Sequence, residues 1–314
     1  MKKSSVGSSF LLFLTACIWG MAFVSQSKGM EYMQPFTFNG VRSLIGALSL
    51  VVYLLVTGRL SAGRFTKTEW KKNLEAGLWC GLALTVASTL QQFGIKYTTV
   101  GKAGFITTLY IIFVPLAGVF LKRKVAGVVW VAAVMAAVGM YLLCMTESLV
   151  LGSGDIMVFL CALVFAVHIM VVDHYAAETD GVVVSCIQFL VCGIVCTAGA
   201  LLWEQPTFSQ ITGGMTSLLY AGVMSCGVAY TLQIVGQKGV NPTVAALILS
   251  LESVVATVSG WIAFRIGFLK EDQTLTGKQI LGCAIVFAAV ILVQLPESWF
   301  HRKKGKESGT RAVS

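Results

Sequence analysis

One acidic residue, Glu252, lies near the middle of a long apolar segment of this 314-residue chain. At the centre of a bilayer a charged side chain costs about 2.5–3.5 kcal/mol on insertion scales, and a low dielectric favours the neutral acid over the anion. Glu252 could therefore take up and release a proton as its surroundings change. The alternative is a structural role, in which a protonated Glu252 forms a hydrogen bond between two helices.

Three further side chains that could do chemistry also fall within apolar segments. Polar groups there face a neighbouring helix or a water-filled cavity rather than lipid. Arg42 lies roughly 9 Å inside its segment at 1.5 Å per residue, so it could extend to the membrane surface, or it could face an anionic substrate or Glu252. His168 titrates near neutral pH where it is accessible, or it is a packed hydrogen-bond donor. Trp19 could line a cavity or fill space between helices.

Two amides and two phenols complete the set of candidate residues: Gln91, Gln233, Tyr110 and Tyr230. Their polar groups could line a binding pocket for a small molecule. The alternative is that each forms an interhelical hydrogen bond, worth about 0.6 kcal/mol in a membrane protein. We favour Gln91 and Gln233 as pocket residues because they occupy equivalent positions in the internal repeat described below.

The nine cysteines lie in or at the ends of apolar segments, and none forms a CxxC pair. Cys192 and Cys196 are one helical turn apart, but no His or carboxylate joins them at the spacing of a metal site. We interpret the cysteines as small packing residues and expect no metal and no cofactor. The chain has no Walker A sequence for ATP and no HExxH pair, so we do not expect an enzyme.

The elements that must position these residues are long apolar segments. The chain is 56% hydrophobic and 12% charged, whereas soluble domains are about 45–50% apolar and about 25% charged. Ten segments approach the roughly 20 residues that a helix needs to cross a bilayer, and lipid requires helices because it offers the backbone no hydrogen-bond partners. The sequence therefore predicts an all-α integral membrane protein with ten transmembrane helices. The segments are approximately Ser8–Ser27, Phe36–Thr57, Leu74–Tyr97, Val100–Leu121, Val125–Met145, Gly154–Tyr175, Gly181–Trp203, Ile211–Lys238, Pro242–Phe264 and Gly277–Leu295.

The distribution of Lys and Arg predicts the orientation. If the N-terminus is cytoplasmic, sixteen of the 23 basic residues lie inside and six lie outside, with Arg42 left within a helix. This asymmetry predicts that both termini are cytoplasmic and that the chain is a multi-pass protein of the cell membrane. A lipoprotein signal ending at Cys17 is the alternative for the N-terminus, but the apolar run continues through Val24, so we favour a retained helix.

The net charge of +9 could in principle indicate nucleic-acid binding. The basic residues, however, lie at the ends of apolar segments, where anionic lipid headgroups attract them. We therefore expect the lipid bilayer and a small-molecule substrate as partners, and no nucleic acid. Small-residue faces at Ala132/Ala136 and Ala284/Ala288 could support a homodimer, but packing within the bundle is the favoured interpretation.

The two halves of the chain resemble each other. The motif Leu-Gln-x-x-Gly-x-Lys occurs twice, 142 residues apart, and two further matches follow at similar offsets, one of them after a one-residue gap. A repeat of five helices places the second copy upside down in the membrane, which suits alternating access. We expect five-helix repeats at 1–146 and 147–296 and a basic cytoplasmic tail at 297–314. The matched segments are 90–96 with 232–238, 78–81 with 219–222, and 13–16 with 159–162.

Several short motifs, taken in order, resemble the EamA-like branch of the drug/metabolite transporter superfamily over nearly the whole chain. They are Trp19-Gly20, Pro35 followed by Arg42, Gly101–Ile106 leading to Pro115, Gly154-Asp155, and Asn241-Pro242 through Leu251-Glu252. The resemblance implies a ten-helix exporter of metabolites, amino acids or drugs, often driven by a proton gradient. It also implies a central cavity lined by helices 1, 3, 4, 6, 8 and 9, with helices 5 and 10 at the periphery.

One position departs from the family pattern. The ninth helix of the family often has Glu-Pro where this chain has Glu252-Ser253, so the proline that would kink the helix there is absent. We predict a secondary transporter, with import or a passive channel as alternatives. A channel needs a continuous polar or charged ring, which one acid and scattered amides do not form. A single acid favours cations or zwitterions over anions as substrates.

Overall fold

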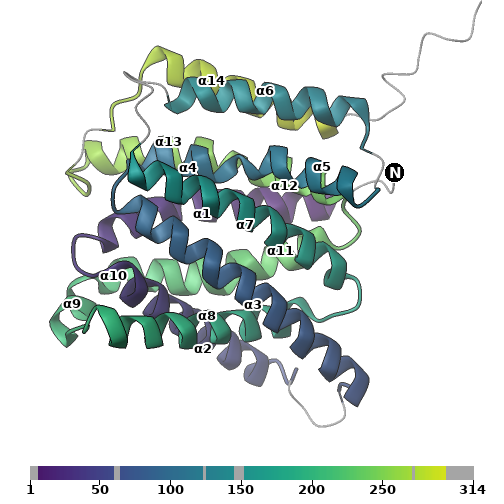
Figure 1. Cartoon of the computed structure of the whole chain (residues 1–314), viewed down its shortest axis with the longest axis vertical. Coiled ribbons are helices and arrows are strands. Elements are labelled where there is room, and N and C mark those ends of the chain that lie inside the picture. The colour runs from purple at the N-terminus through teal and green to yellow at the C-terminus, as the bar shows by residue number, and fades with distance from the viewer. Residues whose placement is uncertain (1–5, 60–63, 123–124, 145–151, 271–272, 295–314) are drawn as a thin grey trace, which may run out of the picture.

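The protein is a bundle of packed helices, seen in a computed structural model that describes residues 6–59, 64–122, 125–144, 152–270 and 273–294 (Figure 1). Every regular element in these ranges is a helix. The predicted tail at 297–314 lies outside the described residues. Eight helical spans are long and apolar enough to cross a membrane. They are α1 (Val6–Gly29), α2 (Pro35–Val56), α3 (Lys67–Ile95), α4 with α5 (Val100–Thr108 and Tyr110–Phe120), α7 (Ser153–Ala176), α8 (Gly181–Trp203), α10 with η1 and α11 (Met215–Leu219, Tyr220–Ala229 and Tyr230–Gln237) and α12 with α13 (Pro242–Leu249 and Leu251–Arg265).

Two shorter apolar helices, α6 (Gly127–Cys144) and α14 (Gly277–Gln294), occupy the places of the fifth and tenth predicted segments. They pack against each other at one edge of the bundle, far from α2 and α8 (Figure 1). A Cβ on Gly139 would lie 2.8 Å from the carbonyl oxygen of Gly282, so these two helices approach closely through small residues. This edge position agrees with what the family resemblance implies for helices 5 and 10.

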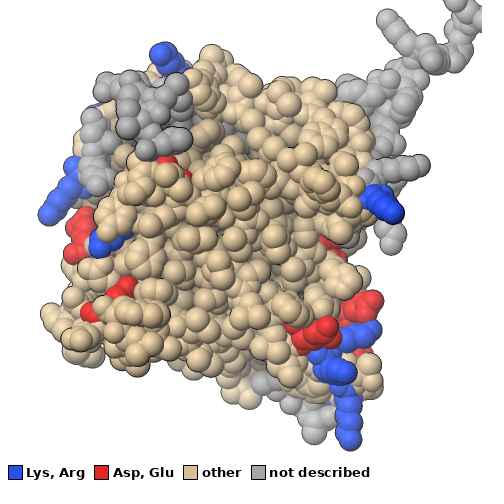
Figure 2. All heavy atoms as spheres, in the orientation of Figure 1, with Lys and Arg blue, Asp and Glu red and all other residues tan. Residues whose placement is uncertain are grey.

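The surface is that of a multi-pass membrane protein. In the face shown in Figure 2, the charged side chains gather at the two ends of the helices, and a wide band between them carries none. Large apolar side chains such as Leu48, Val134 and Ile194 are exposed within the described helices. A contiguous apolar exterior of this extent is unfavourable in water, whereas in a bilayer it faces lipid tails.

Two spans are interrupted near their centres, which the sequence did not predict. The fourth span breaks at Leu109, between α4 and α5, and the ninth breaks at Ser250, between α12 and α13. Just before each break a hydroxyl bonds to a carbonyl three residues earlier, from Thr108 Oγ1 to Phe105 at 2.8 Å and from Ser250 Oγ to Leu247 at 2.7 Å. Such hydroxyls compete with the helical backbone and bend it. The same bond occurs within uninterrupted helices, at Ser49 in α2 and Ser259 in α13, so it accompanies the breaks but does not by itself cause them. The ninth span is interrupted even though no proline follows Glu252.

The eighth span begins later than predicted and contains an unusual element. The apolar run expected from Ile211 is divided at Gly214 between the short helix α9 (Phe208–Gly213) and α10. Within this span, residues Tyr220–Ala229 form a π-helix. A π turn holds one more residue than an α turn, because its hydrogen bonds join residues five apart instead of four. The one-residue gap in the sequence repeat falls in this region, between the matched segments 219–222 and 232–238.

Candidate functional site

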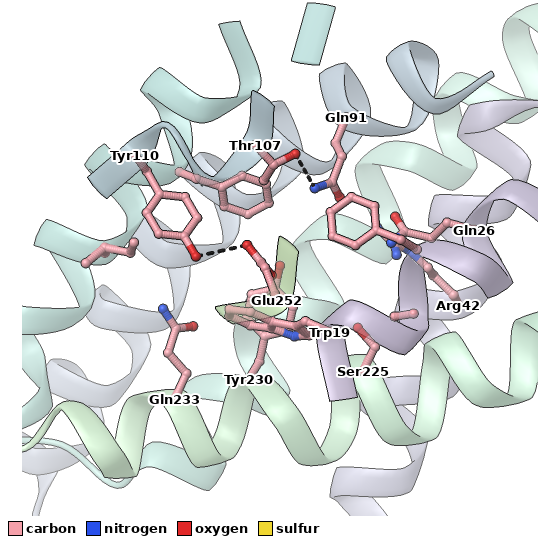
Figure 3. Close-up of a pocket in the computed structure, with 14 residues that line it drawn as sticks. Trp19, Gln26, Arg42, Gln91, Thr107, Tyr110, Ser225, Tyr230, Gln233 and Glu252 are labelled. Carbon is pink, nitrogen blue, oxygen red and sulfur yellow. Dashed lines mark hydrogen bonds between the residues drawn. The ribbon is translucent and has the colours of Figure 1, made fainter. Parts of the chain in front are cut away.

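A buried cavity lies at the centre of the bundle, between α1, α2, α3, α4, α5, α7, η1, α11 and α13 (Figure 3). Its volume in this conformation is about 30 Å³, room for about two water molecules. All the candidate residues predicted from the sequence line it except His168. The lining candidates are Trp19, Arg42, Gln91, Tyr110, Tyr230, Gln233 and Glu252.

Glu252 and Tyr110 form the central polar contact of the cavity. The Tyr110 hydroxyl donates a hydrogen bond to Glu252 Oε1 at 2.9 Å, and both side chains are buried (Figure 3). Each residue lies in the first turn after a helix break, Tyr110 in α5 and Glu252 in α13. The breaks thus place two polar side chains, and the ends of two half-helices, at the same point in the bundle.

The two repeat-equivalent glutamines lie on different sides of Glu252. Gln91 Nε2 donates to Thr107 Oγ1 at 3.2 Å, so its amide is partly satisfied by the cavity wall. Gln233 is also buried, and its Oε1 has no hydrogen-bond partner among the described residues. A buried unsatisfied carbonyl costs roughly 1–3 kcal/mol. Gln233 therefore offers a free acceptor to anything that enters the cavity.

Aromatic side chains form one wall of the cavity. The rings of Trp19 and Tyr230 are 4.5 Å apart between centroids, and Phe189 packs edge-on against Tyr230 at 5.1 Å. Trp19 Nε1 is buried without a partner among the described residues. An indole N–H normally finds an acceptor when it is buried, so this wall combines an apolar surface with one unused donor.

His168 lies behind this wall and does not line the cavity. Its Nε2 is 3.2 Å from Gln188 Oε1, and its ring is edge-on to Tyr230 at 5.9 Å. The position matches the alternative that the sequence left open, a packed side chain with one hydrogen bond. From here His168 contacts two residues that line the cavity, Tyr230 and Phe165.

One interpretation of the sequence was that the Arg42 side chain extends to the membrane surface. In the structure it does not. Its side chain is only 6% exposed and lines the cavity. The guanidinium lies over the Phe38 ring at 5.5 Å, and Nε has no hydrogen-bond partner among the described residues. The Arg42 side chain thus faces the cavity, and a role toward an anionic substrate or Glu252 stays a prediction.

Two polar residues that line the cavity, Gln26 and Ser225, were not among the candidates predicted from the sequence. Gln26 could have been found, because it follows Trp19 by seven residues and so shares its helix face. Ser225 could not, because its relation to Tyr230 depends on the π-helix. Residues five apart diverge on an α-helix, with 3.6 residues per turn, but they align on a π turn.

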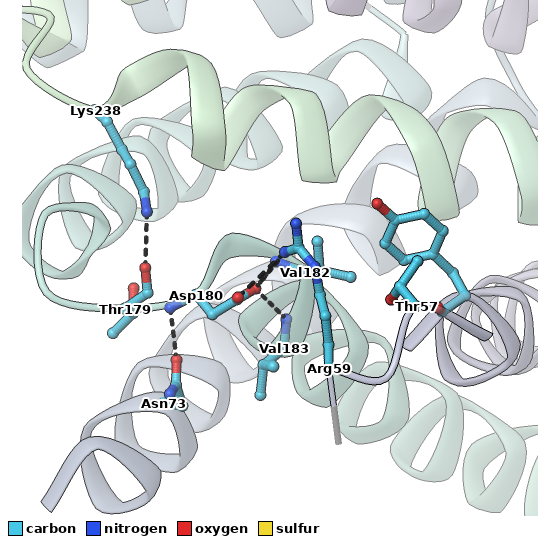
Figure 4. A network of polar contacts seen from close by, with 9 residues as sticks. Thr57, Arg59, Asn73, Thr179, Asp180, Val182, Val183 and Lys238 are labelled. Carbon is cyan, nitrogen blue, oxygen red and sulfur yellow. Dashed lines mark hydrogen bonds and ion pairs between the residues drawn. The ribbon is translucent and has the colours of Figure 1, made fainter. Parts of the chain in front are cut away.

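One end of the bundle is held together by polar contacts (Figure 4). Arg59 forms an ion pair with Asp180 at 3.2 Å, Asn73 Oδ1 accepts from the Asp180 backbone N–H at 2.8 Å, and Lys238 Nζ donates to the Thr179 carbonyl at 2.8 Å. These residues line a second cavity of about 480 Å³. Together the contacts join the α7–α8 connection to α3, to the end of α2 and to the residue that follows α11.

A neighbouring ion pair joins the α7–α8 connection to the first turns of α3. Lys72 donates to Glu178 on the surface, and this hydrogen bond holds the pKa of the Glu178 carboxyl below its usual range. The opposite end of the bundle has its own contacts. There Lys102 pairs with Asp155 at 2.6 Å, and Lys96 donates to Gln34 Oε1 at 2.6 Å.

Comparison with known proteins gives consistent matches over the full length. The sequence matches the EamA-like transporter family over residues 7–145 and 152–295. It is 31% identical to an uncharacterized transporter of Archaeoglobus fulgidus, over 90% of this chain and 84% of that protein. It is 26% identical to the uncharacterized transporter YwfM of Bacillus subtilis, over 91% of this chain and 95% of that one. One crystal structure shares the fold, with a TM-score of 0.71 and 17% identity over 92% of this chain and 97% of that chain.

Proposed function

This chain belongs to the EamA-like transporter family, and from that premise we propose that it is a secondary transporter that exports small molecules across the cytoplasmic membrane by alternating access. The observation that carries the proposal is the central cavity. Arg42, Gln91, Gln233 and Glu252 converge there, inside a bundle of apolar helices. Polar and ionisable groups are expensive within a membrane and mark substrate or ion pathways.

We propose ten transmembrane helices in two inverted five-helix repeats, with α6 and α14 as the fifth and tenth. Reciprocal glycine contacts support this arrangement. A Cβ on Gly81 would lie 3.1 Å from Gln188 Cα, and a Cβ on Gly222 would lie 2.9 Å from the Arg42 carbonyl oxygen. Gly222 follows Gly81 by 141 residues, and Gln188 follows Arg42 by 146. In two five-helix repeats the third span corresponds to the eighth, and the second to the seventh. The contact of the third span with the seventh therefore has its counterpart in the contact of the eighth with the second, as symmetry between the halves requires.

The two helix breaks also lie at corresponding positions of the two halves. Thr108 and Ser250, whose hydroxyls bond to the backbone just before the breaks, are 142 residues apart, and so are Tyr110 and Glu252. In an inverted repeat, equivalent residues that touch each other must lie close to the symmetry axis. The Tyr110–Glu252 hydrogen bond is such a contact. It therefore lies where the two halves change position relative to each other during alternating access.

The conformation described here fits a state closed on the cytoplasmic side. With a cytoplasmic N-terminus, the ion pair of Arg59 and Asp180 lies at the inner end of the bundle. The cavity residues Gln26, Arg42 and Gln91 lie within about two helical turns of the outer ends of α1, α2 and α3. The polar contacts of the inner end thus separate the cavity from the cytoplasm.

We assign proton coupling to Glu252. After the substrate leaves, the carboxylate takes up a proton from the outer side, and it releases that proton to the cytoplasm when the halves have changed position. Tyr110 holds the acid in place through its hydrogen bond to Oε1. Each proton that enters down its gradient then drives one substrate outward.

The test is untargeted profiling of the medium around cells that overproduce the protein. We expect one class of metabolite to rise outside cells with the wild type and with Glu31→Gln, a matched change at a loop acid that pairs with Lys28. Glu252→Gln should abolish the rise while reaching the membrane in equal amount. Faster depletion of a solute from the medium would instead indicate import. An equal rise with Glu252→Gln would remove Glu252 from the coupling mechanism.

A further inference from the structure

Arg42 is a buried cation without an anionic partner in the described part of the chain. Its side chain is 94% buried, Nε makes no hydrogen bond, and none of the ion pairs within 4 Å involves it. The guanidinium stays charged in a protein and carries five donors in a fixed planar fork.

This arrangement is costly unless something else completes it. A buried charge without a partner is strongly unfavourable. The Phe38 ring at 5.5 Å offsets part of the cost through a cation–π interaction, but it accepts no conventional hydrogen bond along the plane of the fork. The basic residues that form ion pairs, such as Lys102 and Arg59, face a carboxylate directly. Arg42 instead faces a cavity.

The surroundings of Arg42 contain further unused polar groups. The indole N–H of Trp19 lines the same cavity and has no acceptor among the described residues. Ser225 adds a hydroxyl to the lining. Figure 3 shows Arg42 on one side of the cavity and Gln233 on the opposite side, with Glu252 between them. Gln26, beside Arg42 in Figure 3, adds a buried amide oxygen that has no donor among the described residues. The region next to Arg42 therefore holds unused donors together with one unused acceptor.

We infer that Arg42 binds a carboxylate, so that the substrate of the proposed transporter is a small organic acid or a zwitterion that carries a carboxylate. A guanidinium and a carboxylate match in shape and charge and form two parallel hydrogen bonds. The inference rests on the proposed transport function and narrows its substrate class. It also revises the expectation drawn from Glu252 alone, because a simple cation could pair with Glu252 but would leave Arg42 unpaired.

The test measures binding to the purified full-length protein in lipid nanodiscs. The probes are acetate and phenylacetate, each compared with its neutral amide of nearly the same shape. Phenylacetate is included because aromatic rings line one wall of the cavity. Binding is read as the probe concentration that gives half of the maximal thermal stabilisation. Sodium chloride is titrated separately in a chloride-free buffer, because chloride is the other small anion that a lone guanidinium attracts.

We expect both carboxylates to stabilise the wild type and the amides to have no effect. Arg42→Gln should raise the half-maximal concentration at least about tenfold, the equivalent of about 1.4 kcal/mol. Arg42→Lys should also weaken binding, because an ammonium keeps the charge but loses the fork. Arg265→Gln, the same change at an exposed arginine outside the cavity, should leave binding unchanged. If Arg42→Gln fails to fold, the comparison of Arg42→Lys with Arg265→Gln decides.

Equal stabilisation by amide and carboxylate would overturn the inference, and so would full carboxylate binding by the folded Arg42 variants. Stabilisation by chloride without any by carboxylates would make this an inorganic-anion site and would also overturn it. The outcome is separable from that of the transport proposal. Flux of a solute without a carboxylate would leave the transporter standing and refute the carboxylate site. Carboxylate binding without flux of any solute would support the carboxylate site and refute the transport proposal.

Discussion

Replacing Gly81 or Gly222 with alanine should destabilise the bundle by similar amounts. The new Cβ would lie 2.8 Å from Val191 Cβ in the first case and 2.7 Å from Ile45 Cβ in the second. Neither neighbour can rotate away, because a Cβ moves only with its backbone. Overpacking of this kind costs about 1–3 kcal/mol, and alanine recovers about 1 kcal/mol of helix propensity. We expect a net loss of up to about 2 kcal/mol for each variant.

The assay is thermal unfolding of each purified variant in the same lipid nanodisc, followed by tryptophan fluorescence. Gly127→Ala and Gly277→Ala are the matched controls, because a Cβ at either position meets nothing within 4 Å in the described structure. Both controls should unfold at or slightly above the wild-type temperature. If Gly81→Ala and Gly222→Ala behave like the controls, the close helix contacts are absent from the protein. If only one of the two destabilises, the packing is not reciprocal and the argument for inverted halves fails.

Three further predictions concern single side chains. Tyr110→Phe removes the hydrogen-bond donor to Glu252 and should lower gradient-driven flux in proteoliposomes. It should also lower the free energy of unfolding by about 0.6–1.5 kcal/mol. Unchanged flux would make the hydrogen bond purely structural. Ser250→Ala removes the hydroxyl that bonds to the backbone before the ninth-span break and should slow transport more than it changes the unfolding temperature, with unaltered turnover as the contrary result. Arg59→Gln breaks the ion pair with Asp180 and should speed hydrogen exchange at the start of α8, whereas unchanged exchange would show that the pair does not hold this end closed.

The helical spans were predictable because lipid imposes a simple rule on the chain. A segment of about 20 apolar residues in a bilayer has no alternative to a helix, so most segments lie close to their predicted positions. The interruptions at Leu109 and Ser250 were not predictable. A hydroxyl that bonds to its own backbone occurs at these breaks and also within uninterrupted helices, as at Ser49 and Ser259, so neither the residue nor its bond distinguishes the two cases.

The candidate site was largely predictable for a related reason. Arg42 and Glu252 stand out because a charged side chain within an apolar run is costly, and the structure brings both to one cavity. Sequence could not decide which polar residues face that cavity. His168 and Gln188 bond to each other behind the wall, whereas Ser225 reaches the cavity through a helix geometry that α-helical periodicity does not describe. The roles of these residues in transport remain predictions.

The π-helix of the eighth span has a consequence for the energy of the transport cycle. If two inverted halves were identical, the inward-open and outward-open forms would be the same structure seen from opposite sides, and they would be equally populated at rest. The third span has an α-helix where the eighth has Tyr220–Ala229, so the two forms are not degenerate. For the alternating-access cycle proposed above, we therefore expect the inserted residue, like the other differences between the halves, to make the two forms unequal in energy before any gradient or substrate acts.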